Sequence, residues 1–456
     1  MLREISRNAK LSVLALVVGF VLMTASTAWA RQPVQIWHTE PNPKTKAVIG
    51  EIIRDYEKLN PGIKIEQQPI GWASLGDKLQ AALAAGAPPD ASHGQTYVER
   101  SLSAKGLLRP LDDLIASIGE DDIYDVVKRL DYHDGHYWGI AHAIGTDVIV
   151  YRKDLYRKAG LPDNKPARDW KAWVSDLKKL SVDTNGDGVK DQYGLGLAGP
   201  GFFINEEVYM WTGSNGGRLF DAKGRPTFTE KPVIEMLELF KELNDCCLWP
   251  GWLNHGYPET FTMLAQGKVA SILGWGRGAV EFEKYAPKIV KNGDFGVFGS
   301  KPVGPSGQDF LTQLDSEPWM VFKDAPHAEE AVDFLKFFYQ KDNYRKYIQT
   351  VPIHFFPITK SMQRDPAYLN QTPEFKTWRF WVDAQQNIIS QGRARPLLMT
   401  EWDDLELPYI NEIAGSAILV DMVTDVVTGA RSPQAAAKRA QSRAERLIED
   451  LGEKRW

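Results

Sequence analysis

Apolar and polar positions along the chain repeat first with the period of a strand and then with that of a helix. Val34–Trp37 alternates as a strand, residues 45–59 place apolar side chains at helical spacing, and residues 63–70 return to an extended pattern. A helical stretch over 75–85 and another short extended segment follow. Strands that alternate with helices of this length predict βαβ units and a largely parallel sheet.

The rest of the chain is predicted to be folded as well. The Asp134-Gly135 pair between two short extended segments predicts a hairpin, and Asp147–Tyr151 has the pattern of a buried strand. Helices are predicted at four further places: 170–180, 208–211, 233–244 and the amphipathic run Pro433–Leu451. No repeat, low-complexity tract or long linker interrupts the pattern, which favours a compact α/β protein.

The first thirty residues have the three parts of a secretory signal peptide. Three basic residues precede the apolar run Leu11–Met23, and Ala28-Trp29-Ala30 supplies the small-residue cleavage pattern. This apolar run is shorter than the roughly 20 residues that span a bilayer as a helix. We expect cleavage after Ala30 and a soluble protein in a Gram-negative periplasm, because no cysteine near the cleavage point could carry a lipid anchor.

Charge and composition narrow the choice of partners. The net charge of −5 becomes −7 when the signal peptide takes away three bases and one acid, and mild acidity gives no reason to expect nucleic acid or an anionic membrane. The 15 tryptophans and 16 tyrosines offer faces that can stack on sugar rings. The two cysteines, Cys246 and Cys247, are neighbours and cannot form a disulfide framework. We expect two buried thiols after a helix, with a vicinal disulfide as the alternative, because a bridge between adjacent residues distorts the peptide.

Four parts of the chain stand in a recognisable order: Val34–His38 through Asn60–Ile65, Asp77–Gly86 followed by Pro88–Asp90, Tyr137–Ile140 with Val150–Tyr156, and Gln266–Ala270 with Ser271–Trp275. In their order and spacing they resemble the large family of extracellular solute-binding proteins that includes the maltose-binding protein. The resemblance runs over nearly all of residues 31–456.

The resemblance implies a type II periplasmic binding protein of the α/β class: two lobes, each a mixed sheet flanked by helices, with the ligand in the cleft between them. Carried onto this chain, one lobe would hold 31–145 and 318–360, and the other 146–317 and 361–456. It also implies that a hinge motion closes the lobes on the ligand. The closed form would then deliver the ligand to the permease of an ABC importer. We expect a monomer.

The sharpest local motif runs from Asp183 to Gln192. Oxygen-bearing side chains alternate along it and a glycine stands at the sixth position, as in a calcium-binding loop, although Gly194 replaces the bidentate glutamate. Similar loops in some alginate- and sugar-binding relatives hold calcium and close the site with the side chain that corresponds to Gln192. A polar turn without an ion is the alternative. We expect a structural calcium ion held by Asp183, Asn185, Asp187, Val189, Asp191 and Gln192.

A second motif, Gly274-Trp275-Gly276-Arg277-Gly278, lies between a predicted strand over 269–273 and a helix that begins near Ala279. It lacks the spacing of either nucleotide-binding fingerprint. The resemblance places this strand end on the cleft wall, so we expect Trp275 to stack on a sugar, with a core position as the alternative. Arg277 could pair with a carboxylate or phosphate of a ligand, or with a local acid such as Glu281.

The resemblance also implies ligand contacts at strand ends and in cleft loops. Residues at these places in this chain are Glu40, Trp72, Gln95, Tyr97, Asp147, Asn205, Tyr209, Asp315, His354, Phe355 and Trp402. Trp72 is expected in a loop before a helix. Aromatic faces with carboxylates and amides favour a carbohydrate or polyol as the ligand. A sugar acid or glycerol phosphodiester anchored by Arg277 is the alternative.

Signatures of enzymes are largely missing from the sequence. It contains no Gly-x-Ser-x-Gly and no His-Glu-x-x-His pattern. His133 and His136 straddle the predicted hairpin turn, so we expect solvated side chains rather than a zinc pair. Acidic pairs such as Asp112-Asp113 and Asp403-Asp404 could suggest a secreted glycan-degrading enzyme, but adjacent side chains point in different directions. We therefore expect a binding protein without a catalytic cofactor.

Overall fold

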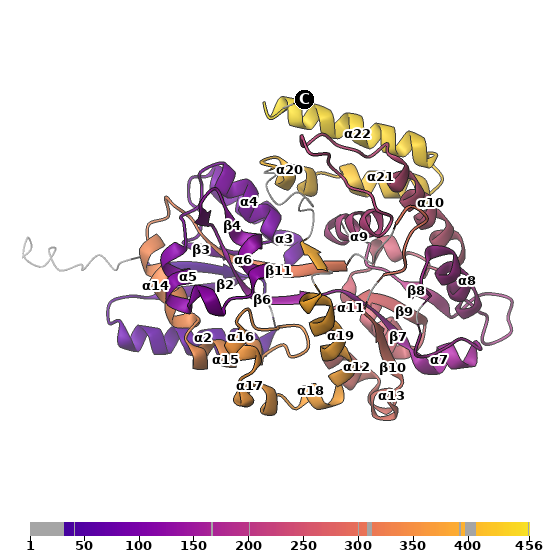
Figure 1. Ribbon diagram of the computed structural model, residues 1–456, viewed down its shortest axis with the longest axis horizontal. Coiled ribbons are helices and arrows are strands. Elements are labelled where there is room, and N and C mark those ends of the chain that lie inside the picture. Colours follow the sequence, from indigo (N-terminus) through magenta and orange to yellow (C-terminus); the bar gives the residue numbers. More distant parts are fainter. Residues whose placement is uncertain are drawn as a thin grey trace, which may run out of the picture.

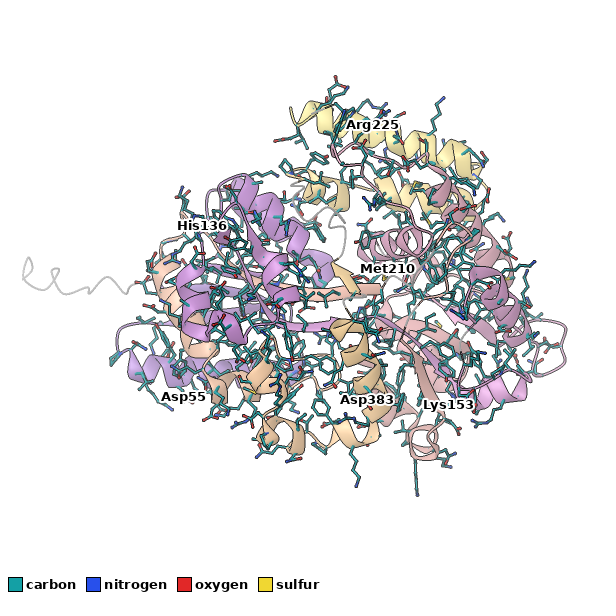
Figure 2. All side chains as sticks on the ribbon, in the orientation of Figure 1. Asp55, His136, Lys153, Met210, Arg225 and Asp383 are labelled. Atoms are coloured by element: carbon teal, nitrogen blue, oxygen red, sulfur yellow. A yellow bond between two sulfur atoms is a disulfide. The ribbon has the colours of Figure 1, made fainter. Side chains whose placement is uncertain are left out.

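The chain folds into two halves, each built on its own β-sheet and covered by helices (Figure 1). Asp55 and His136 lie on the half that contains the first sheet, while Lys153 and Arg225 lie on the other half (Figure 2). No helix in the described ranges is long and apolar enough to cross a membrane. The computed structural model describes residues 32–40, 42–165, 167–199, 201–299, 301–307, 312–391, 394–396, 407–454 and 456.

The first sheet brings together strands from the beginning and the later part of the chain. β1 runs parallel to β2 and β3, as the alternating pattern predicted, whereas β11 runs antiparallel to β3 and β6. The carboxyl ends of β1 and β3, at His38 and His93, therefore meet at one edge of the sheet, the edge at which α/β proteins bind ligands. Its strands are β12 (Ala394–Pro396), β11 (Thr312–Val321), β3 (Ala91–His93), β1 (Val34–His38) and β2 (Ile65–Pro69) in spatial order, and β6 (Ile140–Thr146) pairs with β11.

The second sheet is formed by the middle of the chain. β8 and β9 are parallel, and β7 runs antiparallel between β9 and β10. Every residue of β7 and of β9 is buried, as expected for strands that are covered on both faces. Its order is β10 (Phe295–Phe298), β7 (Val148–Arg152), β9 (Val269–Gly274) and β8 (Tyr193–Gly196). The predicted strands over 147–151 and 269–273 are thus confirmed as β7 and β9 within one residue.

Two segments cross between the halves next to each other. β6 leads through Asp147 directly into β7, and the hydroxyl of Thr312 at the start of β11 donates to the Asp147 carbonyl at 2.8 Å. α19 (Arg379–Ser390) contacts both β6 and β10 and so bridges the two sheets. β12 comes from a segment that we assigned to the second lobe, yet it pairs with β11 of the first sheet. The lobe boundaries stay a prediction.

Helices of the second half form a layered stack that ends with the C-terminal helix (Figure 1). α8 (Trp170–Leu180) and α22 (Pro433–Asp450) match the predicted helices closely, and α10 (Lys231–Cys246) contains the helix predicted over 233–244. α21 (Ile418–Val427) packs between α10 and α22, where buried alanines of α22 allow close contact. α20 (Ile410–Gly415) contacts α4 (Thr96–Ala104) of the first half, so the C-terminal segment reaches both halves.

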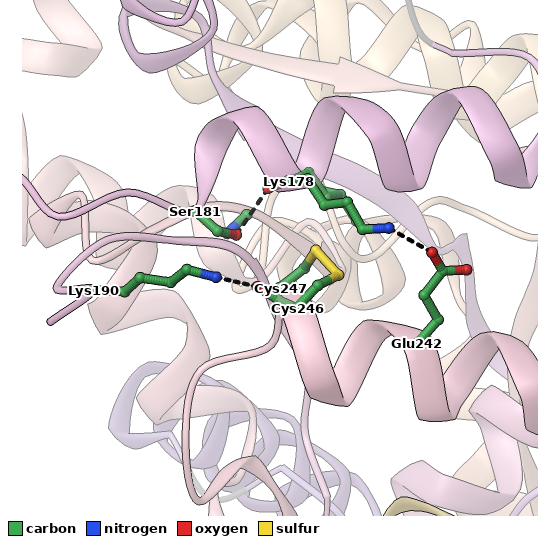
Figure 3. Close-up of a disulfide and its surroundings, with 8 residues drawn as sticks. Lys178, Ser181, Lys190, Glu242, Cys246 and Cys247 are labelled. Atoms are coloured by element: carbon green, nitrogen blue, oxygen red, sulfur yellow. Dashed lines mark hydrogen bonds and ion pairs between the residues drawn. A yellow bond between two sulfur atoms is a disulfide. The ribbon is translucent and has the colours of Figure 1, made fainter.

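Cys246 and Cys247 form a vicinal disulfide, so our expectation of two thiols was wrong (Figure 3). The helix α10 ends at Cys246, and Cys247 leaves helical geometry with φ −139°, which turns the two side chains toward each other. The amine of Lys190 donates to the Cys246 carbonyl at 3.0 Å. The N–H of Leu195 in β8 donates to the Cys247 carbonyl at 3.0 Å. The ring therefore lies where α10 meets both the Asp183–Gln192 loop and the second sheet.

Candidate functional site

A groove of about 520 Å³ lies where helices of the two halves meet. Its walls come from α3 (Trp72–Ala84) and α4 of the first half, from α9 (Gly201–Ser214) of the second, and from α20 and α21. It brings together four residues that we predicted to bind ligand: Trp72, Gln95, Tyr97 and Asn205. Trp72 is the first residue of α3 rather than part of a loop, so its expected position is corrected by one helical turn.

Three aromatic rings, several amides and the carboxylate of Asp77 stand among the mostly aliphatic and small residues that line this groove. Trp72, Tyr97 and Phe203 offer ring faces, and Gln95 and Asn205 offer amides. The Asn205 side-chain N–H donates to the carbonyl of Ala414 at 2.8 Å, and its buried Oδ1 has no hydrogen-bond partner among the described residues. Buried acceptors of this kind are rare in folded proteins. The groove therefore offers stacking faces and amide groups to a molecule with hydroxyl groups.

Trp275 is not among the described residues that line this groove, but it packs against one of them. The residue follows β9 and is half-buried. Its ring centroid is 5.8 Å from that of Phe203 and 6.1 Å from that of Tyr257. Since Phe203 lines the groove, Trp275 supports the wall through it. Our expectation that Trp275 stacks directly on a ligand stays a prediction.

Arg277 and Glu40 form a bidentate ion pair that joins the two halves. Two guanidinium nitrogens donate to the two carboxylate oxygens at 3.0 and 2.5 Å. The side chain of Glu40 is fully buried and that of Arg277 is 18% exposed. The guanidinium carbon also lies 5.2 Å from the ring centre of Phe355. Glu281, the local partner that the sequence left open, is thus not the acid that binds this arginine.

A second group of buried titratable side chains lies near this ion pair, and the sequence analysis missed it. Glu317 and His142 share a hydrogen bond of 2.7 Å, and the Tyr347 hydroxyl lies 2.9 Å from the other nitrogen of His142. Burial, reinforced by the charge of Glu40, raises the pKa of Glu317 to about 8. Burial lowers the pKa of His142 to about 3. At neutral pH the Glu317–His142 pair therefore shares one proton and carries no net charge.

His93 also belongs to this group, which raises the question of a metal ion. Ligand atoms of His93, His142 and Glu317 lie within 4.8 Å of one another. The two imidazole rings, however, stack at 4.0 Å with planes only 12° apart. The lone pair of an imidazole nitrogen lies in the ring plane, so one ion cannot lie near both planes. The main-chain N–H of Thr39 also occupies Nδ1 of His93 at 3.3 Å. These residues do not fit a metal site.

The remaining predicted ligand residues have different places. His354 and Phe355 are buried beside Arg277, whose charge helps to lower the pKa of His354 after the larger effect of burial. Asp147 is buried at the crossing between the halves, and its charge opposes the lowering of the Lys301 pKa by burial. Tyr209 is buried in the core of the second half. Asp315 of β11 pairs with Gly145 of β6, and the side chain of Asp315 lies outside the described atoms. Trp402 lies outside the described residues.

The Asp183–Gln192 loop is held by hydrogen bonds from its own backbone. Asp183 accepts from the N–H groups of residues 185, 186 and 188 at 3.1, 2.6 and 2.7 Å. These bonds lower the pKa of Asp183. Asn185 and Asp187 each accept from the N–H two residues further on at 2.9 and 2.8 Å. The side-chain amide of Gln192 instead donates to the carbonyl of Leu180 at 2.8 Å, and it is buried. Calcium binding by the loop stays a prediction.

The predicted hairpin is present as β4 (Tyr132–His133) and β5 (His136–Tyr137), but its two histidines differ. His136 is exposed, with Nδ1 2.8 Å from Asp112. His133 has a side chain only 8% exposed, with Nε2 3.2 Å from Glu99. Our expectation of two solvated side chains was therefore wrong for His133, which faces a buried carboxylate of α4.

Sequence comparison relates the chain to transport proteins over most of its length. The family described as bacterial extracellular solute-binding protein matches residues 38–345. A putative ABC transporter periplasmic-binding protein of Escherichia coli is 22% identical over 430 residues, which cover 91% of this chain and 93% of the relative. A putative binding protein of Brucella abortus is 24% identical over 433 residues, which cover 94% of this chain and 96% of the relative.

Solved structures share the two-lobed fold. A solute-binding protein of an ABC transporter from Thermotoga lettingae has a TM-score of 0.73 at 19% identity, covering 91% of this chain and 100% of its own. A solute-binding protein from Agrobacterium radiobacter also has a TM-score of 0.73, at 22% identity, with coverage of 91% and 100%. These likenesses establish the α/β architecture that the sequence predicted.

Proposed function

The chain belongs to the bacterial extracellular solute-binding proteins, and from this premise we propose that it captures a neutral carbohydrate or polyol between its two halves. Its relatives are periplasmic binding proteins of ABC transporters, and members of the family bind solutes rather than convert them. We further propose that it works in the periplasm after removal of residues 1–30 and delivers its ligand to the permease of an ABC importer.

The lining of the interlobe groove carries the proposal. Trp72, Tyr97 and Phe203 provide apolar ring faces for the C–H face of a sugar. The amides of Gln95 and Asn205 provide donors and acceptors for hydroxyl groups. The volume of about 520 Å³ falls within the usual range of small-molecule sites, about 300–1,000 Å³.

The Glu40–Arg277 ion pair favours a neutral ligand over an anionic one. The bidentate contact already uses two of the five guanidinium N–H donors, at one edge of the group, where a ligand carboxylate or phosphate could otherwise bind in the same way. An anionic ligand that took this edge would have to displace Glu40 and leave its buried charge unpaired, a change that costs about 3–5 kcal/mol. A neutral ligand leaves the pair intact.

Ligands of structural neighbours support the same class. The Thermotoga lettingae protein was solved with α-D-tagatose and the Agrobacterium radiobacter protein with ribitol. A maltose/maltodextrin-binding domain from Bdellovibrio bacteriovorus was solved with maltotriose. All three are neutral polyhydroxylated molecules.

A thermal-shift screen against neutral sugars, polyols, uronates and glycerol phosphodiesters tests the proposal. A ligand that binds only the folded protein at a concentration of one hundred times Kd stabilises it by about 2.7 kcal/mol. We expect stabilisation by a neutral sugar or polyol and recovery of that molecule unchanged by mass spectrometry. Stabilisation by anionic compounds alone, or conversion of the hit to a product, would contradict the proposal.

A further inference from the structure

The carboxyl ends of β1 and β3 carry two buried histidines whose Nδ1 atoms each accept a main-chain N–H. Nδ1 of His38 accepts from Glu40 at 3.2 Å, and Nδ1 of His93 accepts from Thr39 at 3.3 Å. The Thr39 hydroxyl lies 3.1 Å from the same nitrogen of His93 and donates to it when that nitrogen accepts the main-chain N–H. Burial lowers the pKa of His38 to about 4 and that of His93 well below its usual value, so both rings are neutral. A neutral imidazole that accepts at Nδ1 carries its hydrogen on Nε2. Both histidines therefore present an Nε2–H donor.

The two donors differ in what they meet. Nε2 of His38 lies 3.0 Å from Oε1 of Gln67, which accepts its hydrogen. Nε2 of His93 is buried, and no hydrogen-bond partner lies within reach of it in the described part of the chain. Buried donors are almost always paired in folded proteins, so an unpaired one needs a reason.

The position of His93 supplies that reason. It ends β3 two residues before Gln95, which lines the interlobe groove. Thr39, which orients its ring, directly precedes Glu40 of the interlobe ion pair. Arg277 of the second half lies close enough for its charge to contribute to the lowered pKa of His93, after burial and the neighbouring histidines. His93 therefore lies close to the contact between the halves, with its ring packed against His142 and Trp319 of the first half at centroid distances of 4.0 and 3.9 Å.

We propose that His93 is a specificity-determining ligand residue whose Nε2–H donates to one acceptor oxygen of the bound sugar or polyol. The inference rests on the proposed function and adds a residue that nothing in the sequence pattern singled out. A hydroxyl oxygen suits this place because it accepts from His93 and can donate its own hydrogen to another acceptor. A carboxylate oxygen of Glu317 lies within 4.8 Å of a His93 nitrogen and is one such acceptor.

Two substitutions at His93 distinguish the roles of its two ring nitrogens. His93→Asn keeps an acceptor near the position of Nδ1 for the Thr39 N–H and removes the Nε2–H. His93→Gln keeps an N–H near the position of Nε2 and gives up the contact with Thr39. His38→Asn is the matched control, because His38 has the same backbone contact and its Nε2–H already has Gln67 as a partner.

Titration calorimetry of the whole mature protein with ribitol, α-D-tagatose, maltotriose and each neutral hit of the screen provides the measurement. We expect His93→Asn to raise Kd at least tenfold, His93→Gln to raise it less, and His38→Asn to leave Kd within about twofold of the wild-type value. Melting temperatures of the ligand-free variants identify any that fail to fold, in which case the remaining His93 variant decides.

Three results would overturn the inference. Wild-type affinity in a folded His93→Asn protein removes His93 from the site while the proposed function stands. Absence of binding by the wild-type protein to every neutral sugar and polyol removes the proposed function and this inference together. A Zn²⁺-dependent rise in melting temperature that His93→Asn abolishes would replace the ligand donor by a metal site.

Discussion

Arg277 illustrates how the role of one side chain depends on a partner far away in the sequence. Its guanidinium is neutralised by Glu40, 237 residues earlier, and lies over the ring of Phe355. A charged pair taken out of water is stable only when its geometry is good and its remaining hydrogen bonds are satisfied. The same arginine that looked like an anchor for an anionic ligand thus holds the two halves together.

Trp72 and Trp275 are expected to respond differently to truncation. Trp72 lies on the groove wall, so Trp72→Ala should weaken ligand binding by about 1–3 kcal/mol, the value of a lost buried aromatic face. Trp275 packs against Phe203 and Tyr257, so Trp275→Ala should in addition lower the free energy of unfolding by about 2–3 kcal/mol. Calorimetry and urea denaturation measure the two effects. Equal stability losses in both variants would show that Trp72 is also a packing residue.

At the scale of elements, the ends of helices and the loops were predicted least well from the pattern of apolar and polar residues. The vicinal disulfide lies at the end of α10, whose last residue is Cys246, and Trp72 begins a helix where a loop was expected. Helix boundaries depend on capping and on contacts just beyond the helix. The interiors of the same helices follow the 3.6-residue period and were predicted well.

The Asp183–Gln192 loop yields a prediction at this scale. We propose that it holds one Ca²⁺, because Asp183, Asn185 and Asp187 keep oxygen lone pairs beyond those used by the loop N–H groups. Chelation should then lower the melting temperature. If calcium was present at one hundred times Kd, its removal reduces the free energy of unfolding by about 2.7 kcal/mol. Asp187→Ala should remove this sensitivity to chelator.

Asp221 provides the matched control for that experiment. It caps another exposed turn by accepting from the N–H groups of Lys223 and Arg225 at 2.8 and 3.0 Å. Asp221→Ala removes a comparable set of turn hydrogen bonds outside the loop, so it should leave the response to chelator intact. If the wild-type protein does not respond to chelator and elemental analysis finds no calcium, the loop is a polar turn.

At the scale of the whole molecule, buried titratable groups link stability to pH. Burial raises the pKa values of Glu207 and Glu317 to about 8, from ordinary values near 4.5. Between the ordinary pKa near 4.5 and the raised pKa of about 8, the folded protein holds protons that the unfolded chain has lost. These two groups therefore make the free energy of unfolding fall as pH rises. Buried histidines act in the opposite direction but only below about pH 6.5, where the unfolded chain takes up protons that the folded protein excludes.

We therefore expect the free energy of unfolding to decrease between about pH 6.5 and 8, by at most about 1.4 kcal/mol per pH unit for each of the two carboxyls. Glu207→Gln removes one titration and keeps an acceptor for the indole N–H of Trp211, which now donates to Glu207 at 2.7 Å. Urea denaturation at pH 6.5, 7.25 and 8 should show a shallower decrease in this variant. An unchanged slope would mean that Glu207 is already ionised in the folded protein.

The sequence by itself determined the architecture and part of the groove. Hydrophobic periodicity is a local property, so α8, α22, β7 and β9 could be predicted from it. The order of these elements, together with the family resemblance, predicted two α/β lobes and placed Gln95, Tyr97 and Asn205 in the cleft.

Only the tertiary structure decided which charges and donors meet there. Two contacts show this: the Glu40–Arg277 pair, and the group formed by His93, His142 and Glu317. Four of these residues lie in or next to strands of the first sheet, and Arg277 lies in a loop of the second. Such contacts depend on strand register and on how the halves meet, and no local pattern encodes either.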